Sequence, residues 1–244
     1  MALRAKPLLF TLVVLAAIIA AGAYYLSSNL NGIVANLIER EGSAVTQTSV
    51  SVSGVDIKLT EASAALSGLT IANPAGFAGN AIELGEFATA LDAGSLTSDT
   101  IVIKNVTVDG ARINVLQQGT KNNLRQLMAN MQSESDTAEA ADADAGAKKI
   151  IIERFTLSGA SASVSLPDLG EAKEVTLPDI VLTDVGRATN GATGAQVAQQ
   201  LLRPIMEAAI TSATAGAIKD KVEAKVGKAV GGLLKGLTGD KEEE

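Results

Sequence analysis

The sequence contains no cysteine, no histidine and no tryptophan. Without cysteine the chain forms no disulfide, so redox chemistry does not reveal its compartment. Without histidine and cysteine it lacks Ser-His-Asp triads, thiol nucleophiles and the usual zinc ligands. We therefore expect a protein that is not an enzyme, with no catalytic residues and no cofactor.

Aromatic residues are also scarce, with two tyrosines and four phenylalanines, and the net charge is −7. Nucleic-acid binding needs a basic surface and usually aromatic rings for stacking, so no nucleic-acid partner is expected. Asp142, Asp144 and Glu153 fit three positions of a calcium loop, but Ala147 stands where the turn glycine belongs. We therefore predict no metal site there.

One uncharged apolar segment covers residues 7–26. At about 1.5 Å per residue it forms a helix of roughly 30 Å, long enough to cross a bilayer once. Arg4 and Lys6 predict that residues 1–6 are cytoplasmic, and Tyr24 and Tyr25 are typical of the far interface. The alternative is a signal peptide cleaved at the small residues 21–23. Both interpretations place the following chain across the membrane, and we expect a retained anchor.

The next segment, residues 27–47, has apolar residues at helical spacing, including Leu30, Ile33, Val34 and Leu37. This spacing predicts a helix that leads out of the membrane.

From residue 48 the apolar period changes to two, as expected for strands with one buried face. The short connections between these runs predict an antiparallel sheet. A short helix with apolar residues at Leu124, Leu127, Met128 and Met131 closes the first part, residues 48–132, and residues 148–186 form the second. The predicted strands are 50–52, 55–59, 65–72, 81–92, 100–109, 111–117, 150–158, 160–165, 173–177 and 180–184.

Between the two parts, residues 133–147 have no large apolar side chain and carry only negative charges, which predicts a disordered linker. Residues 187–238 are predicted to be helical, with a kink or restart at Pro204, and 239–244 form a charged tail. Lysines flank an apolar stripe that includes Val222 and Val226. These helices pack on the sheet or lie on an anionic membrane surface.

Two turn segments carry a family resemblance. The sequence around Asn73, Pro74, Gly76 and Phe77 reads as an NPxGF turn, and residues 91–96 read as an LDxxSL segment. Together with "IVIKNVTVDGARI" and the helix that follows it, they resemble the AsmA-like envelope proteins, whose larger relatives include TamB. The resemblance covers most of the chain.

The resemblance implies a bacterial inner-membrane protein with one N-terminal helix and a periplasmic antiparallel sheet curled into a groove. The expected fold class is therefore α+β, with a transmembrane helix, about eight to ten strands and C-terminal amphipathic helices. The implied function is to bind or guide lipid acyl chains, or to assist cell-envelope and outer-membrane biogenesis. The implied partners are the membrane, phospholipid and other envelope proteins.

The candidate site is one face of the sheet, where Ile101, Ile103, Val106 and Val108 are expected to face lipid. Phe77 is expected either to fill the core beneath its turn or to line the rim of the groove. The alternative is a structural or scaffolding module without a lipid ligand, in which the C-terminal helices cover this face.

Overall fold

The computed structural model describes residues 29–138, 148–165 and 172–238. The predicted cytoplasmic segment 1–6, the predicted membrane helix 7–26 and the predicted tail 239–244 lie outside these ranges. Among the helices of the described ranges, none combines the length and apolar character needed to cross a bilayer.

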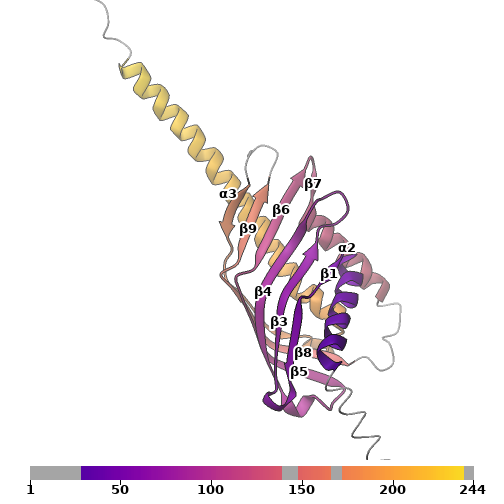
Figure 1. Cartoon of the computed structure of the whole chain (residues 1–244). Helices are drawn as coiled ribbons and strands as arrows, with labels where there is room; N and C mark the ends of the chain where they lie inside the picture. The colour runs from indigo at the N-terminus through magenta and orange to yellow at the C-terminus, as the bar shows by residue number, and fades with distance from the viewer. Residues whose placement is uncertain (1–28, 139–147, 166–171, 239–244) are drawn as a thin grey trace, which may run out of the picture.

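The fold is α+β and consists of a curled, open sheet with helices on its concave side (Figure 1). The predicted strands are confirmed closely. The eleven strands are β1 (Val50–Ser51), β2 (Gly54–Lys58), β3 (Ser63–Ala72), β4 (Asn80–Leu91), β5 (Thr100–Asp109), β6 (Arg112–Gln118), β7 (Lys121–Asn122), β8 (Lys149–Ser158), β9 (Ser161–Ser165), β10 (Lys173–Thr176) and β11 (Ile180–Val185).

Several of these strands are halves of longer paths. β1 and β2 pair with β3 in one continuous register, and β5 and β6 pair in the same way with β4. β8–β9 runs beside β5–β6, and β10–β11 runs beside β8–β9. The sheet is therefore six long strand paths side by side, four of which are interrupted.

The prediction of a purely antiparallel sheet is wrong, because the sheet is mixed. β5 pairs with β8 and β6 pairs with β9 in parallel. Parallel neighbours need a long crossover connection, and here the chain between β6 and β8 contains a helix. The short spacing between strands in the sequence predicts the hairpins, but it does not predict that the chain crosses back and pairs β8 in parallel with β5.

A row of glycines crosses the sheet where the paths are interrupted. The pairing registers place Gly68, Gly85, Gly110 and Gly159 opposite one another on four neighbouring paths. Three of them have positive φ: +60° at Gly68, +76° at Gly110 and +61° at Gly159. Glycine adopts this conformation at no steric cost. The row therefore lets neighbouring strand paths depart from regular strand geometry at the same level of the sheet.

The glycine row divides the sheet into two halves. We call the half that holds β2, β5, β8 and β11 the proximal half, and the half that holds β1, β6, β9 and β10 the distal half. Residues 29–46 form a helix that begins beside β2, so the start of the described chain lies at the proximal end (Figure 1). This agrees with the helix predicted over residues 27–47.

This helix covers one edge of the sheet with side-chain acceptors. Edge strands expose unpaired N–H groups that invite association, and proteins commonly block them. Three backbone donors of the edge path are satisfied in this way. The bonds run from Ile57 N to Asn31 Oδ1 (3.0 Å), from Val52 N to Glu39 Oε1 (2.9 Å) and from Val50 N to Ser43 Oγ (2.9 Å).

Two further helices complete the described fold: α2 (Asn123–Ala138) and α3 (Gly194–Thr238). α2 continues into the segment 133–147 that was expected to be a linker, and residues 139–147 lie outside the description. α3 is one helix through Pro204, so the predicted restart at that residue is absent. Proline removes one intrahelical bond, while burial of Val197, Ile205 and Met206 on both sides holds the helix together.

Candidate functional site

The concave face of the sheet is aliphatic and is built from rows of cross-strand neighbours. Side chains of directly paired residues share a face, so the registers define each row. One row is Val55, Leu66, Phe87, Val108, Leu157 and Ile180. The next is Ile57, Ala64, Thr89, Val106, Phe155 and Leu182.

In the distal half most of this face is covered. α2 packs on β6 and α3, and α3 packs on β6, β8, β9, β10 and β11. Ile113, Val115, Ala162 and Val164 are at most 2% exposed. The exceptions are Leu69, Leu84 and Val175, which face the same side and are half-buried, so the concave side of the distal half is mostly but not completely covered.

The four residues expected to face lipid separate into two pairs. Val106 and Val108 are 7% and 1% exposed and belong to the central core. Ile101 and Ile103, which lie nearer the proximal end of β5, are half-buried. In this conformation only the second pair presents surface that a ligand can reach.

Ile101 and Ile103 belong to a larger half-buried surface, which we call the apolar strip. It follows the strands on the side of the sheet nearest the helix of residues 29–46. The apolar strip consists of Val55, Ile57, Ala64, Phe87, Leu91, Ile101 and Ile103, all half-buried. Ile180 and Leu182, at the other end of the same two rows, are half-buried as well.

Thr89 is the one polar residue in the two rows and lies between Ala64 and Val106. It is 9% exposed, and its hydroxyl has no hydrogen-bond partner in the structure. A buried hydroxyl without a partner is costly, so its position beside the apolar strip is unusual. Sequence alternation predicts that residue 89 faces inward, but it gives no reason for a threonine there.

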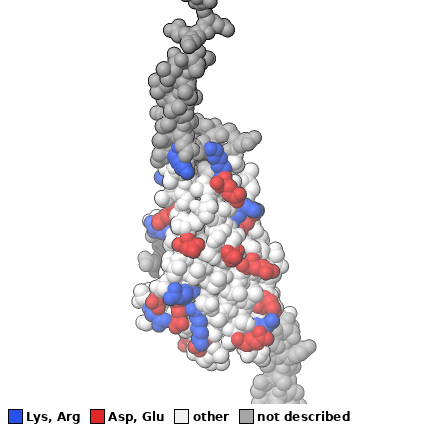
Figure 2. Space-filling view, turned by 90° about the vertical axis from the view of Figure 1, so that its left-hand side faces the viewer, with Lys and Arg blue, Asp and Glu red and all other residues white. Residues whose placement is uncertain are grey.

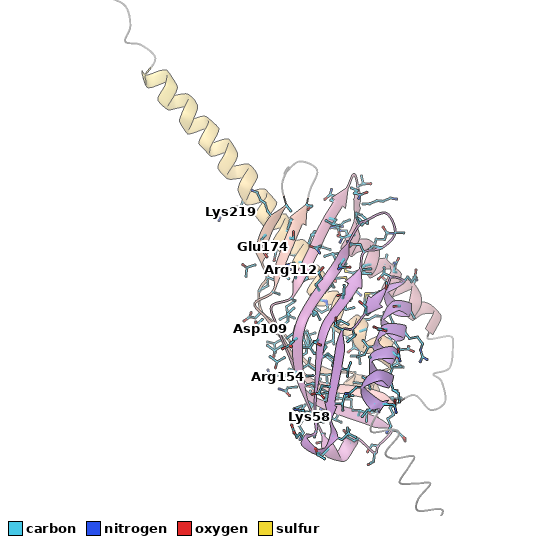
Figure 3. All side chains as sticks on the ribbon, in the orientation of Figure 1. Lys58, Asp109, Arg112, Arg154, Glu174 and Lys219 are labelled. Atoms are coloured by element: carbon cyan, nitrogen blue, oxygen red, sulfur yellow. The ribbon has the colours of Figure 1, made fainter. Side chains whose placement is uncertain are left out.

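Apolar side chains are also exposed at the proximal end. Ile33 and Leu37 lie on the helix of residues 29–46 and are 49% and 46% exposed. Leu59 is also 46% exposed, in the turn between β2 and β3 next to Lys58, which Figure 3 labels at this end of the sheet. Exposed apolar residues are common singly. Ile33 and Leu59 lie toward the proximal end, whereas Leu37 lies nearer the middle of the edge, two residues before Glu39, which contacts Val52.

The NPxGF turn is held by a buried asparagine rather than arranged around an open site. Asn123 at the start of α2 is 0% exposed, and its side-chain nitrogen donates to Asn73 Oδ1 and to Asn114 O, both at 2.7 Å. Asn73 in turn donates to Ala78 O at 2.8 Å. Pro74 is buried, whereas Gly76 is exposed with φ of +97°. The motif therefore builds a turn and docks it against α2.

Phe77 is half-buried, and its N–H donates to Pro74 O at 3.1 Å. The expectation that its ring fills the core is not matched, because the ring stays partly exposed at the turn. The aromatic residue within the core is Phe155, which is 5% exposed.

The LDxxSL segment also has a structural role. Asp92 caps a short turn by accepting from Gly94 N at 2.8 Å, and Ser95 Oγ accepts from Val102 N at 2.9 Å. The Gly94 hydrogen bond, together with the Lys104 ammonium 3.5 Å away, lowers the pKa of the Asp92 carboxyl from its ordinary value. This is charge stabilisation of a turn, not the tuning of a catalytic acid.

Charges are dispersed over the face of the protein that Figure 2 presents. Figure 2 shows basic and acidic side chains interspersed on the face it presents, without a large patch of one sign. The ion pairs that Arg112 makes with Glu83 and Arg187 with Glu153 are exposed. In the described ranges there is no group of three acidic, histidine or cysteine side chains placed to hold a metal ion.

Comparison with protein-family models and with curated proteins gives no match. The site must therefore be interpreted from the chemistry of this chain.

Proposed function

We propose that this protein is an AsmA-like envelope protein, anchored in the bacterial inner membrane with most of its chain in the periplasm. In this proposal it binds or guides lipid acyl chains along the apolar strip and so assists cell-envelope or outer-membrane biogenesis. The observation that supports it best is the incomplete cover over the aliphatic residues of the proximal half.

An acyl chain needs apolar surface and little else. Burial of each methylene contributes about 0.8 kcal/mol, so a few contacts along the strip are enough to hold part of a chain. The strip has no charged residue among its members, and its side chains are mostly aliphatic. A charged headgroup would remain outside, because burial of an unpaired charge is costly.

The position of the strip also supports the proposal. The predicted membrane segment ends at residue 26, three residues before the described helix begins beside β2. If the segment is an anchor, the proximal half is the part of the protein nearest that membrane. An acyl chain leaving the bilayer would then meet Ile33 and the strip first.

A second candidate is a scaffolding module with no lipid ligand. The burial of Val106 and Val108 favours it, because the centre of the concave face already has a cover of protein. In this second candidate the apolar strip binds nothing and is only the less tightly packed edge of the hydrophobic core. The two candidates differ in whether lipid reaches Ile103.

A comparison of three lysine substitutions on β5 separates them. Ile103→Lys places a charge on the apolar strip, Val108→Lys places one in the core, and Thr107→Lys is a matched control on the exposed face. Each variant is tested for melting and for photo-crosslinking to a phospholipid with an acyl diazirine. We expect Val108→Lys to unfold, since a buried unpaired charge is severely destabilising.

Ile103→Lys is expected to fold and lose most of the crosslinking, while Thr107→Lys keeps both properties. If the parent protein takes no label, acyl binding is ruled out and the scaffolding role stands. If Ile103→Lys is labelled like the parent, lipid is held somewhere other than the apolar strip.

A further inference from the structure

α3 consists of two parts with different surroundings. Up to Gly216 it covers the sheet, and a methyl group placed at Gly216 would lie 3.4 Å from Val175 on β10. After Lys219, which Figure 3 labels near the end of the sheet, the helix runs on past the other elements (Figures 1 and 3). Residues 217–238 therefore form about 33 Å of helix beyond the sheet.

The sequence of this projecting segment is amphipathic. Spacings of three and four residues place Ile218, Val222, Val226, Val230 and Leu233 along one side of the helix axis. The same geometry places Lys228 and Lys235 on the opposite side and Lys221 and Lys225 along one flank of the apolar side, while Lys219 falls within the apolar side at its start. Five lysines against one aspartate and one glutamate give the segment a net charge of +3, in a chain whose net charge is −7.

We propose that residues 217–238 are a docking helix for an anionic lipid surface. A helix with an aliphatic side and a lysine-rich side lies in the interface of such a membrane, with its apolar side among the acyl chains. The lysines are attracted by the negative surface potential. The four glycines at 227, 231, 232 and 236 make this segment a weak helix by itself, so a surface that buries its apolar side would stabilise it.

The charge pattern favours lipid over a second copy of the chain. Paired helices usually match positive and negative residues along their flanks, whereas here no acidic residue follows Glu223 within the helix. Two such segments side by side would repel each other. The acidic residues after 238 lie close to Lys235 but leave the earlier lysines unaffected, because Lys228 lies ten residues before that point. Ten residues are about 15 Å of helix, and charges are screened over about 8 Å.

The direction of α3 adds a geometric consequence. It leaves the sheet at the end opposite to residue 29 (Figure 1). The proposed docking helix and the start of the described chain therefore lie at opposite ends of the sheet. This inference does not depend on acyl binding at the apolar strip.

The absence of cysteine allows a direct test with one introduced label. Val226→Cys on the apolar side and Ala224→Cys on the lysine side each receive an environment-sensitive NBD dye. The full chain is held in phosphatidylcholine nanodiscs and mixed with vesicles of phosphatidylglycerol and phosphatidylcholine, or of phosphatidylcholine alone. We expect a blue shift and quenching by spin-labelled lipid only at residue 226 and only with the anionic vesicles.

The combined substitution of Lys221, Lys225 and Lys228 by Gln should raise the anionic vesicle concentration needed for half of the shift on the order of 100-fold. A control with Lys58, Lys121 and Lys149 changed to Gln removes the same charge from the body and should bind as the parent does. No shift at residue 226 overturns the proposal. A shift without vesicles that grows with protein concentration overturns it too, in favour of self-association.

Discussion

Asn123 at the start of α2 donates a 2.7 Å hydrogen bond to the side-chain oxygen of Asn73, fifty residues earlier in the chain. Asn123 is fully buried, and its own oxygen accepts from Leu116 N at 2.8 Å. One side chain thus joins the NPxGF turn, β6 and α2. The turn motif on which the family resemblance rests is a folding element of the distal half.

Replacing Asn123 with Ala should destabilise the protein by roughly 2–4 kcal/mol, because it leaves buried backbone and side-chain groups without partners. Asn122→Ala is the matched control. Asn122 Oδ1 accepts from Arg125 N at 3.0 Å, a helix cap whose loss costs about 1 kcal/mol. Urea denaturation measures both. Equal losses in the two variants would show that the buried network adds nothing beyond an ordinary cap.

Alanine substitutions in the glycine row should lower the stability of the protein by amounts that differ from one position to the next. Gly85 has ordinary φ and open space around it, Gly110 has positive φ only, and at Gly159 an added methyl would also lie 2.7 Å from Asp109 Oδ1. We expect Gly85→Ala to change stability by less than about 0.5 kcal/mol and Gly110→Ala to cost about 1–2 kcal/mol. Gly159→Ala should cost more than Gly110→Ala. Thermal denaturation gives the order, and a flat series would contradict the assigned backbone geometry.

Asp92 predicts a pH-dependent contribution to stability. Its pKa is lowered in the folded protein, so it stabilises the fold above the unfolded value of about 4 and loses this effect as the pH falls through the folded value. Asp92→Asn should therefore unfold more easily than the parent at pH 7, and the gap should close below about pH 4. A gap of the same size at pH 3 would show that the charge is not the cause.

Thr89 predicts a gain of stability from a conservative change. Thr89→Val removes the unpartnered buried hydroxyl and keeps the shape, so the free energy of unfolding should rise by about 1–2 kcal/mol. Thr107→Val on the exposed face is the control and should change little. If Thr89→Val is destabilised instead, the hydroxyl has a partner in solution. Repeating the melts after delipidation would then tell whether that partner is lipid.

The sequence predicts most of this fold because its signals are local. Alternation at Val106 and Val108 marks a strand, and the spacing of Leu124, Leu127 and Met131 marks a helix that is buried in the structure. The parallel pairings are not local, since β5 meets β8 only after the chain has passed through β6 and α2. The four glycines can be found in the sequence, but their alignment across the sheet cannot be predicted, because it depends on the register of distant strands.

The candidate site is predicted less completely. Ile101, Ile103, Val106 and Val108 alternate in the same way, yet only the first two remain half-buried. Burial depends on the elements that pack against each part of the sheet, and no pattern within β5 determines that. The role of Asn123 is hidden for a similar reason, because its partner Asn73 belongs to a distant turn.

Acyl binding at the apolar strip is tested most directly by mapping where a lipid touches the protein. The full chain is irradiated with a phospholipid that carries a diazirine near the end of one acyl chain, and the labelled peptides are identified by mass spectrometry. The proposal predicts label within residues 55–66 and 87–103, with little in 111–117. Label confined to residues 1–28 and 217–238, or no label at all, would contradict it.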